Sequence, residues 1–139
     1  MTLKDKDRIN LIKYRIEQSE ETIYDVQLLI DNNRLRSAVN RIYYAIFYSL
    51  LALGLANQFE TSKHTQLIGW FNKNFIRTGL IDQKYGKIAN KAFIRRTKGD
   101  YDIYVKYDKE IVKEMFSEMK EFVSEVKSFL NTKFPYGKE

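Results

Sequence analysis

The chain has 139 residues, no cysteine, one proline, six glycines and a formal net charge of +6. This length fits one domain, and so few glycines and prolines argue against an all-β fold with many turns. The lack of cysteine excludes a disulfide framework and a thiolate metal site. The N-terminus is charged and no continuous apolar run approaches the roughly 20 residues of a membrane span, so we expect a cytoplasmic protein without membrane contact.

Five helices are expected in chain order, over about residues 4–31, 34–56, 63–75, 82–98 and 107–132. In the first helix, isoleucines recur at three- and four-residue steps until Asp31-Asn32-Asn33 interrupts the pattern. The second is apolar on nearly all sides, which is typical of a central, buried helix. Small residues form one strip of it, where another helix can approach closely, and the neighbouring strip carries Arg41, Tyr44 and Tyr48.

The last three helices have recognisable ends. Thr61 or Ser62 is the expected N-cap of the third helix, and Asp82 is the expected N-cap of the fourth. The fourth helix should stop at Lys98, with Gly99 as its C′ residue. The fifth has the most regular apolar face. The whole pattern predicts an all-α, four- to five-helix up-and-down bundle forming a single domain over residues 1–139, with a core of about 8–130.

Positive charge is concentrated in the middle of the chain. Residues 61–99 contain nine basic side chains and one acidic side chain, whereas the remainder has 15 basic and 17 acidic ones. Five of these cations follow helical spacing on the fourth helix: Lys84, Lys87, Lys91, Arg95 and Lys98. Such a stripe favours a polyanionic partner, and the alternative is a solvated helix face neutralised by nearby acids.

Residues 95–104 are the densest polar segment of the chain. Arg95 and Arg96 extend the apolar face of the fourth helix, so their guanidinium groups need an anion or several acceptors. Phosphate is one such anion, because arginine binds it in a bidentate manner. The alternative is structural: both arginines suit a helix C-terminus and can pair with Asp100 or Asp102.

Other chemistry in the sequence is sparse. Tyr101 and Tyr104 could stack on bases or bind phosphate, although a chain with ten tyrosines uses many of them for packing. Two aspartates in one loop are a weak metal signal, so neither a metal nor another cofactor is expected. His64 is the only histidine, and its ordinary pKa near 6.5 suits acid–base catalysis, but its position favours a partly buried capping or surface role.

Three motifs together resemble small HEPN-domain proteins: Tyr43-Tyr44-Ala45 within residues 37–47, then Ser62-Lys63-His64, then the segment from Arg96 to Tyr101. The resemblance covers roughly residues 8–130. It implies a helical bundle that forms a homodimer, and a toxin encoded beside a minimal nucleotidyltransferase antitoxin. Active members resemble metal-independent endoribonucleases with an Arg-x4-6-His motif.

Carried onto this chain, the resemblance gives Arg96 the role of the motif arginine, with Arg95 as the alternative, and places Tyr101 at the histidine position. Tyrosine, with a pKa near 10, is a poor base at neutral pH. Ile103 stands where the family carries a modifiable tyrosine, next to Tyr104. The chain is thus similar to the standalone subgroup that lacks the motif histidine.

Two functions follow as hypotheses. In the first, the chain is a toxin-like or RNA-binding protein with metal-independent endoribonuclease activity. Its catalytic residues would be Arg96, Tyr101 and His64, and the residues binding phosphate or nucleic acid would be Arg41, Arg95, Lys98, Asp100 and Tyr104. In the second, the chain is a non-catalytic module that binds a nucleotide or a protein, and the basic stripe is a docking surface. A purely structural bundle is the remaining alternative.

Overall fold

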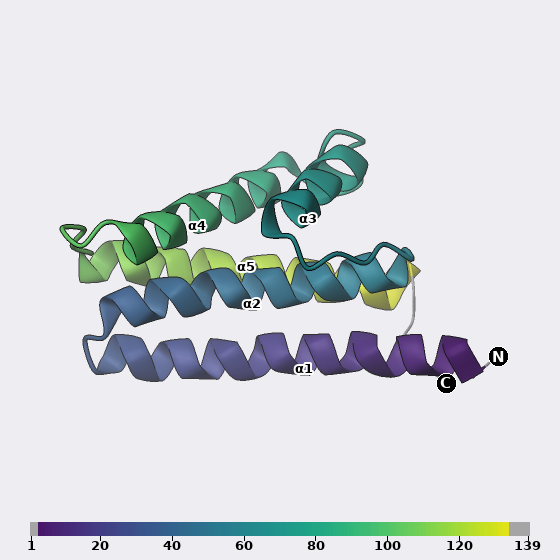
Figure 1. The fold of residues 1–139 in the computed structure, drawn as a ribbon, viewed down its shortest axis with the longest axis horizontal. Coiled ribbons are helices and arrows are strands. Elements are labelled where there is room, and N and C mark those ends of the chain that lie inside the picture. The colour runs from purple at the N-terminus through teal and green to yellow at the C-terminus, as the bar shows by residue number, and fades with distance from the viewer. Residues whose placement is uncertain (1–2, 134–139) are drawn as a thin grey trace.

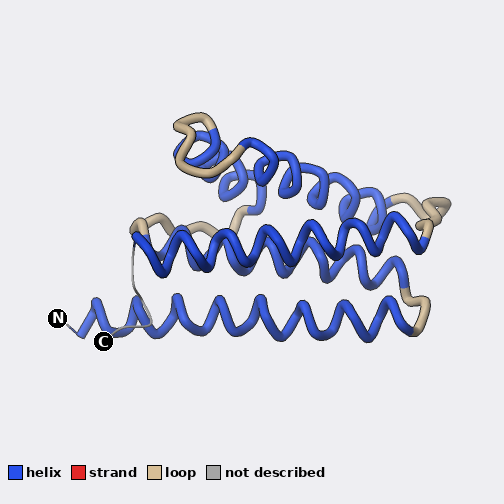
Figure 2. The backbone as a smooth tube through the Cα atoms, turned by 180° about the vertical axis from the view of Figure 1, so that it is seen from behind, coloured by secondary structure: helices blue, strands red, loops and turns tan. Residues whose placement is uncertain are grey.

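The computed structural model describes residues 3–133. Within them the elements are α1 (Leu3–Asp31), α2 (Leu35–Ala56), α3 (His64–Phe71), the π-helical turn η1 (Asn72–Ile76), α4 (Gln83–Tyr101) and α5 (Lys109–Lys133). Helices α1, α2 and α5 lie side by side, and α4 with α3 covers the opposite side of α2 (Figures 1 and 2). The predicted all-α bundle is confirmed.

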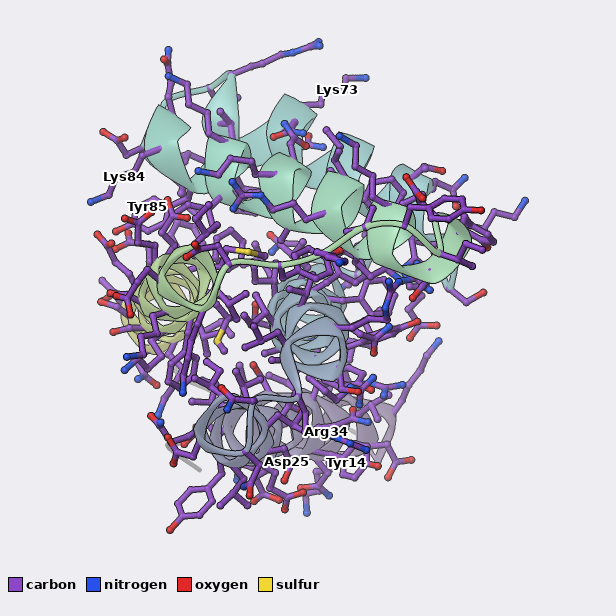
Figure 3. All side chains as sticks on the ribbon, turned by 90° about the vertical axis from the view of Figure 1, so that its left-hand side faces the viewer. Tyr14, Asp25, Arg34, Lys73, Lys84 and Tyr85 are labelled. Atoms are coloured by element: carbon purple, nitrogen blue, oxygen red, sulfur yellow. The ribbon has the colours of Figure 1, made fainter. Side chains whose placement is uncertain are left out.

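Helix α2 is the centre of the bundle. Viewed roughly along the helices, it has α1 on one side and α4 and α5 on the others, with side chains filling the space between them (Figure 3). By length and composition α2 could cross a membrane, but 72% of its most apolar window is buried inside the protein. Its apolar surface is therefore buried by packing against the other helices, as expected for a core helix.

The small-residue strip of α2 lets α1 approach closely. Ala38, Ala45 and Ala52 are fully buried. The buried hydroxyl of Ser19 on α1 donates a 2.7 Å hydrogen bond to the carbonyl oxygen of Ala45. The chain reverses between these helices at Asn33, which adopts a left-handed φ of 57°. Asparagine tolerates this conformation better than most residues, which explains why the helix ends where it does.

Two predicted helix ends differ from the structure. The N-cap of α3 is Lys63, not Thr61 or Ser62, because the Thr61 hydroxyl accepts a hydrogen bond from the Lys63 amide outside the helix. Helix α4 continues through Gly99 to Tyr101 instead of stopping at Lys98. The predicted Asp82 N-cap is confirmed, since its side chain accepts a 2.9 Å hydrogen bond from the Lys84 amide.

Gly99 serves close packing rather than helix termination. A Cβ atom at this position would lie 2.6 Å from the hydroxyl oxygen of Tyr107, which is too short for any real contact. Glycine within a helix costs about 1 kcal/mol relative to alanine. The sequence rule that interprets glycine as a helix stop fails here because the space is needed by Tyr107, a residue in the loop that follows α4.

Candidate functional site

Arg96 lies in a half-buried position between α4 and α2. Its Nε atom forms an ion pair with Asp100 Oδ2 at 2.8 Å, one helical turn along, and its side chain is 20% exposed. One terminal nitrogen donates a 3.3 Å hydrogen bond to the Tyr44 hydroxyl. The guanidinium also contacts the rings of Tyr43 and Tyr44, at 5.5 and 5.4 Å from their centroids. The predicted structural pairing of Arg96 with Asp100 is thus present.

Asp100 and Tyr44 do not use all the hydrogen-bonding capacity of Arg96. A guanidinium group has five N–H donors in a planar fork. One nitrogen faces Asp100 and a second bonds Tyr44, which leaves donors on the terminal nitrogens for a further acceptor. Because the side chain reaches the surface, an anion from solution can meet those donors.

His64 is positioned by aromatic side chains of α2. Its Nδ1 atom lies 2.6 Å from the Tyr43 hydroxyl, and its ring stacks on Phe47 with centroids 4.1 Å apart and planes inclined by 8°. The Tyr44 ring meets the imidazole edge-on at 5.8 Å. As the first residue of α3, His64 has its backbone held by the helix and its ring clamped by α2.

Burial and charge set the protonation states of this pair. Desolvation lowers the pKa of His64 below its ordinary value of 6.5, and the positive charge of Arg96 lowers it further. Burial raises the pKa of Tyr43 well above its ordinary value. Both groups are therefore neutral near pH 7. When Nδ1 carries the hydrogen and donates it to Tyr43, Nε2 has the free lone pair that a general base needs.

Arg41 joins the same cluster through Tyr44. Its guanidinium lies 4.6 Å from the centroid of the Tyr44 ring, the ring that Arg96 also contacts. Tyr44 therefore brings two arginines together, and Asp100 offsets one of the two positive charges. We call the group Arg41, Tyr43, Tyr44, His64, Arg96 and Asp100 the Arg96 cluster.

The last turn of α4, which carries Arg96 and Asp100, is held by two side chains from elsewhere in the chain. Arg36 at the start of α2 donates hydrogen bonds to the carbonyl oxygens of Gly99, Asp102 and Val105. The Tyr107 hydroxyl donates a 2.8 Å hydrogen bond to the Arg95 carbonyl oxygen. These contacts satisfy backbone acceptors that a helix end and loop leave unpaired. They also tie the end of α4 to the start of α2 and to the loop before α5.

Other predicted site residues lie outside the Arg96 cluster. Arg95 lines a small gap with Ile42 and Glu118, on the side of α4 that faces α5. Lys98 is exposed. Tyr101 and Tyr104 are 81% and 84% exposed. In the described part of the chain neither tyrosine side chain contacts Arg96, and their proposed roles in the site stay predictions.

Acids of α5 neutralise part of the cationic stripe. Lys84 forms an ion pair with Glu121, and Lys91 pairs with Glu118 at 3.5 Å. Figure 3 shows Lys84 and Tyr85 on the side of α4 that faces α5. Hydrogen bonding to Glu121 raises the pKa of Lys84, so this lysine stays charged. Two of the five stripe cations thus follow the alternative of a helix face neutralised by nearby acids.

Sequence reasoning missed several residues that shape the site. Tyr43 and Tyr44 were recognised as part of a motif but not as partners of Arg96 or His64, and Arg36 and Tyr107 were not singled out. The helical phase of Arg41 and Tyr44 was the available signal for their proximity. In residues 3–133 no group of three or more histidine, aspartate or glutamate side chains is arranged to hold a metal ion.

Comparisons with known proteins found one family model and several relatives that match most of the chain. The HEPN domain model matches residues 12–129. The "UPF0332 protein" of Thermotoga maritima is 37% identical over 92% of this chain and 96% of its own length. Two proteins of Methanocaldococcus jannaschii are each named "Putative toxin". The first is 38% identical over 71% of this chain and 74% of its own length. The second is 30% identical over 85% of this chain and 80% of its own length.

Proposed function

The chain belongs to the HEPN domain family, and from this premise we propose that it is a toxin-like protein that binds RNA at the Arg96 cluster and cleaves it without a metal ion. The main supporting observation is that Arg96 and His64 lie in one cluster. Arg96 has N–H donors left for an anion, and His64 is neutral and held in place by Tyr43. The names of the two Methanocaldococcus proteins support the toxin-like character.

Arg96 and Arg41 would bind a backbone phosphate. Both guanidinium groups lie against the Tyr44 ring, where they are partly shielded from water and their attraction for an anion is stronger than in bulk solvent. Because arginine matches phosphate in a bidentate manner, the N–H donors of Arg96 that do not bond Tyr44 or face Asp100 are its natural contact. Asp100 holds the guanidinium in place from the opposite edge.

His64 would act as the base of the cleavage step. Its Nε2 atom accepts the proton of a ribose 2′-hydroxyl, and the 2′-oxygen then bonds to phosphorus. The bond from phosphorus to the 5′-oxygen breaks, and that oxygen takes a proton from solvent. The products are a 2′,3′-cyclic phosphate and a 5′-hydroxyl. Arg96 stabilises the negative charge that grows on phosphate during this step.

Binding is tested with purified protein and labelled single-stranded RNA in EDTA. Arg96→Ala should weaken binding at least about tenfold, the loss expected for a charged hydrogen-bond partner of phosphate. Arg77→Ala is the matched control, because it removes an equal charge from an exposed position of the same basic segment. Equal losses in the two variants would mean that only net charge matters and would overturn the assignment of the site.

Cleavage is tested on the same RNA by detecting the 2′,3′-cyclic phosphate. His64→Gln should abolish product formation while leaving RNA binding near the wild-type level. Arg96→Ala should reduce both. Cleavage that persists in His64→Gln would remove His64 from the mechanism, and Tyr101→Phe then tests the residue at the family's histidine position.

A second candidate function, a protein-binding module, is favoured by the end of α4 and the loop that follows it. Tyr101, Ile103 and Tyr104 are each at least 80% exposed, an unusual concentration of large apolar side chains on a surface. We propose that this loop contacts a minimal nucleotidyltransferase antitoxin, and that the chain acts as a homodimer in the cytoplasm. Co-purification with a neighbouring nucleotidyltransferase, lost in Ile103→Asp, would support this partner.

A further inference from the structure

We propose that a cavity beside the Arg96 cluster is a guanine-binding subsite for the RNA bound there, an inference that rests on the proposed function. The cavity measures about 470 Å³ and lies between α1, α2 and the segment that leads into α3. Ligand pockets commonly measure about 300–1,000 Å³ and combine apolar walls with a few polar groups. A nucleobase fits this description.

Phe47 connects the cavity to the Arg96 cluster. Its side chain lines the cavity and its ring also stacks on His64 at a centroid distance of 4.1 Å. One aromatic ring therefore separates the imidazole from the cavity. The cavity and His64 thus share one aromatic side chain, which places them next to each other against α2.

The cavity walls are aromatic and aliphatic, with Tyr48, Leu51, Leu55 and Phe59 among the lining residues. Aromatic side chains bind bases by stacking, worth about 1–3 kcal/mol per base. Phe59 is supported from behind by Trp70, which stacks on it in parallel at 4.8 Å. The Phe59 wall is therefore well ordered.

Gly54 fixes the Phe59 segment against α2. A Cβ at Gly54 would lie 2.6 Å from the Phe59 carbonyl oxygen, so only glycine allows this approach. The Phe59 amide also donates a 2.8 Å hydrogen bond to the Gly54 carbonyl oxygen. The wall that would meet the base is thus held by backbone contacts and does not depend on a bound ligand.

Two charged side chains of opposite sign line the cavity, and together they favour guanine over the other bases. Arg15 and Glu60 both contribute to its lining, and among the described residues they form no ion pair with each other. Arginine is the usual partner of guanine O6 and N7. A carboxylate accepts hydrogen bonds from guanine N1–H and N2–H, a donor pair that no other RNA base presents together. Arg15 bonds Gln18 through one nitrogen at 2.9 Å, which leaves its other donors available.

The test uses the four nucleoside 3′-monophosphates and the fluorescence of Trp70, the single tryptophan of the chain. Because Trp70 stacks on Phe59, a base in the cavity should change its emission. Guanosine 3′-monophosphate should bind at least about tenfold more tightly than the other three nucleotides. Glu60→Gln should remove this preference, whereas Glu114→Gln, an exposed site on α5, should keep it.

Variants at Arg96 and Glu60 distinguish the guanine subsite from the proposed phosphate site. Arg96→Ala should weaken all four nucleotides equally and leave the guanine preference intact, because Arg96 binds the phosphate. Equal affinity for the four nucleotides in the wild type would overturn the guanine assignment while leaving Arg96-dependent RNA binding standing. Guanine preference that survives Glu60→Gln would also overturn it. If Arg96→Ala binds all four nucleotides as tightly as the wild type and still prefers guanosine 3′-monophosphate, the phosphate site would be overturned and the guanine site would stand.

Discussion

The contact between Gly99 and Tyr107 predicts that Gly99→Ala destabilises the wild-type protein but stabilises the Tyr107→Phe variant. A Cβ at Gly99 would lie 2.6 Å from the Tyr107 hydroxyl oxygen, but 3.5 Å from the nearest ring carbon. The same hydroxyl donates a 2.8 Å hydrogen bond to the Arg95 carbonyl oxygen. Gly99→Ala must therefore displace the hydroxyl, whereas the ring alone would tolerate the added methyl group.

The magnitudes follow from three terms. Alanine in place of helical glycine stabilises by about 0.5–1 kcal/mol. In the wild type, Gly99→Ala also loses a hydrogen bond worth about 1 kcal/mol and adds overpacking of about 1–3 kcal/mol. The net effect is a destabilisation of about 1–3.5 kcal/mol, the sum of the two losses less the gain. In Tyr107→Phe, which itself costs about 1 kcal/mol, the hydroxyl is gone and only the gain of about 0.5–1 kcal/mol remains.

The assay is urea unfolding of the wild type, both single variants and the double variant, followed by circular dichroism. The four free energies of unfolding should yield a coupling of about 2–4 kcal/mol between the two positions, because the lost hydrogen bond and the overpacking occur only when the hydroxyl is present. An equal cost of Gly99→Ala in both backgrounds would refute the reasoning. The space beside the Tyr107 hydroxyl would then not be what requires glycine at position 99.

Three further predictions concern contacts around the site and the core. Arg36→Ala should destabilise the protein by about 1–3 kcal/mol and speed amide hydrogen exchange in residues 99–105, because three carbonyl oxygens lose their donor; Arg34→Ala at the same end of α2 should change neither measurement. The pKa of His64 is lowered on folding, so the unfolded state binds the proton more readily and the free energy of unfolding should fall as pH drops below about 6.5. Thermal melts of His64→Gln should show a smaller loss of stability over this pH range, and a pH dependence equal to that of the wild type would contradict the prediction. Ser19→Ala should cost about 1 kcal/mol in urea unfolding through the lost bond to Ala45, and a neutral result would show that the close approach of α1 to α2 does not depend on that bond.

Most of the fold could be predicted from local patterns. The apolar periodicity of residues 4–31 and 107–132 located α1 and α5, and the nearly uniform apolarity of α2 indicated its central position. Helix periodicity is a short-range property, so a single sequence contains it. The two incorrect helix ends, at Thr61–Lys63 and Gly99, both depend on where a particular hydrogen bond or side chain lies.

The sequence by itself determined that the protein is helical, that its positive charge is concentrated in residues 61–99, and that Arg96 and His64 are candidates for chemistry. Only the tertiary structure decided that these candidates share one cluster. The bond between Tyr43 and His64 joins residues 21 positions apart, and that between Arg96 and Tyr44 spans 52 positions. Such contacts depend on how α2, α3 and α4 pack together, and the packing is set by the whole core rather than by the spacing of any one motif.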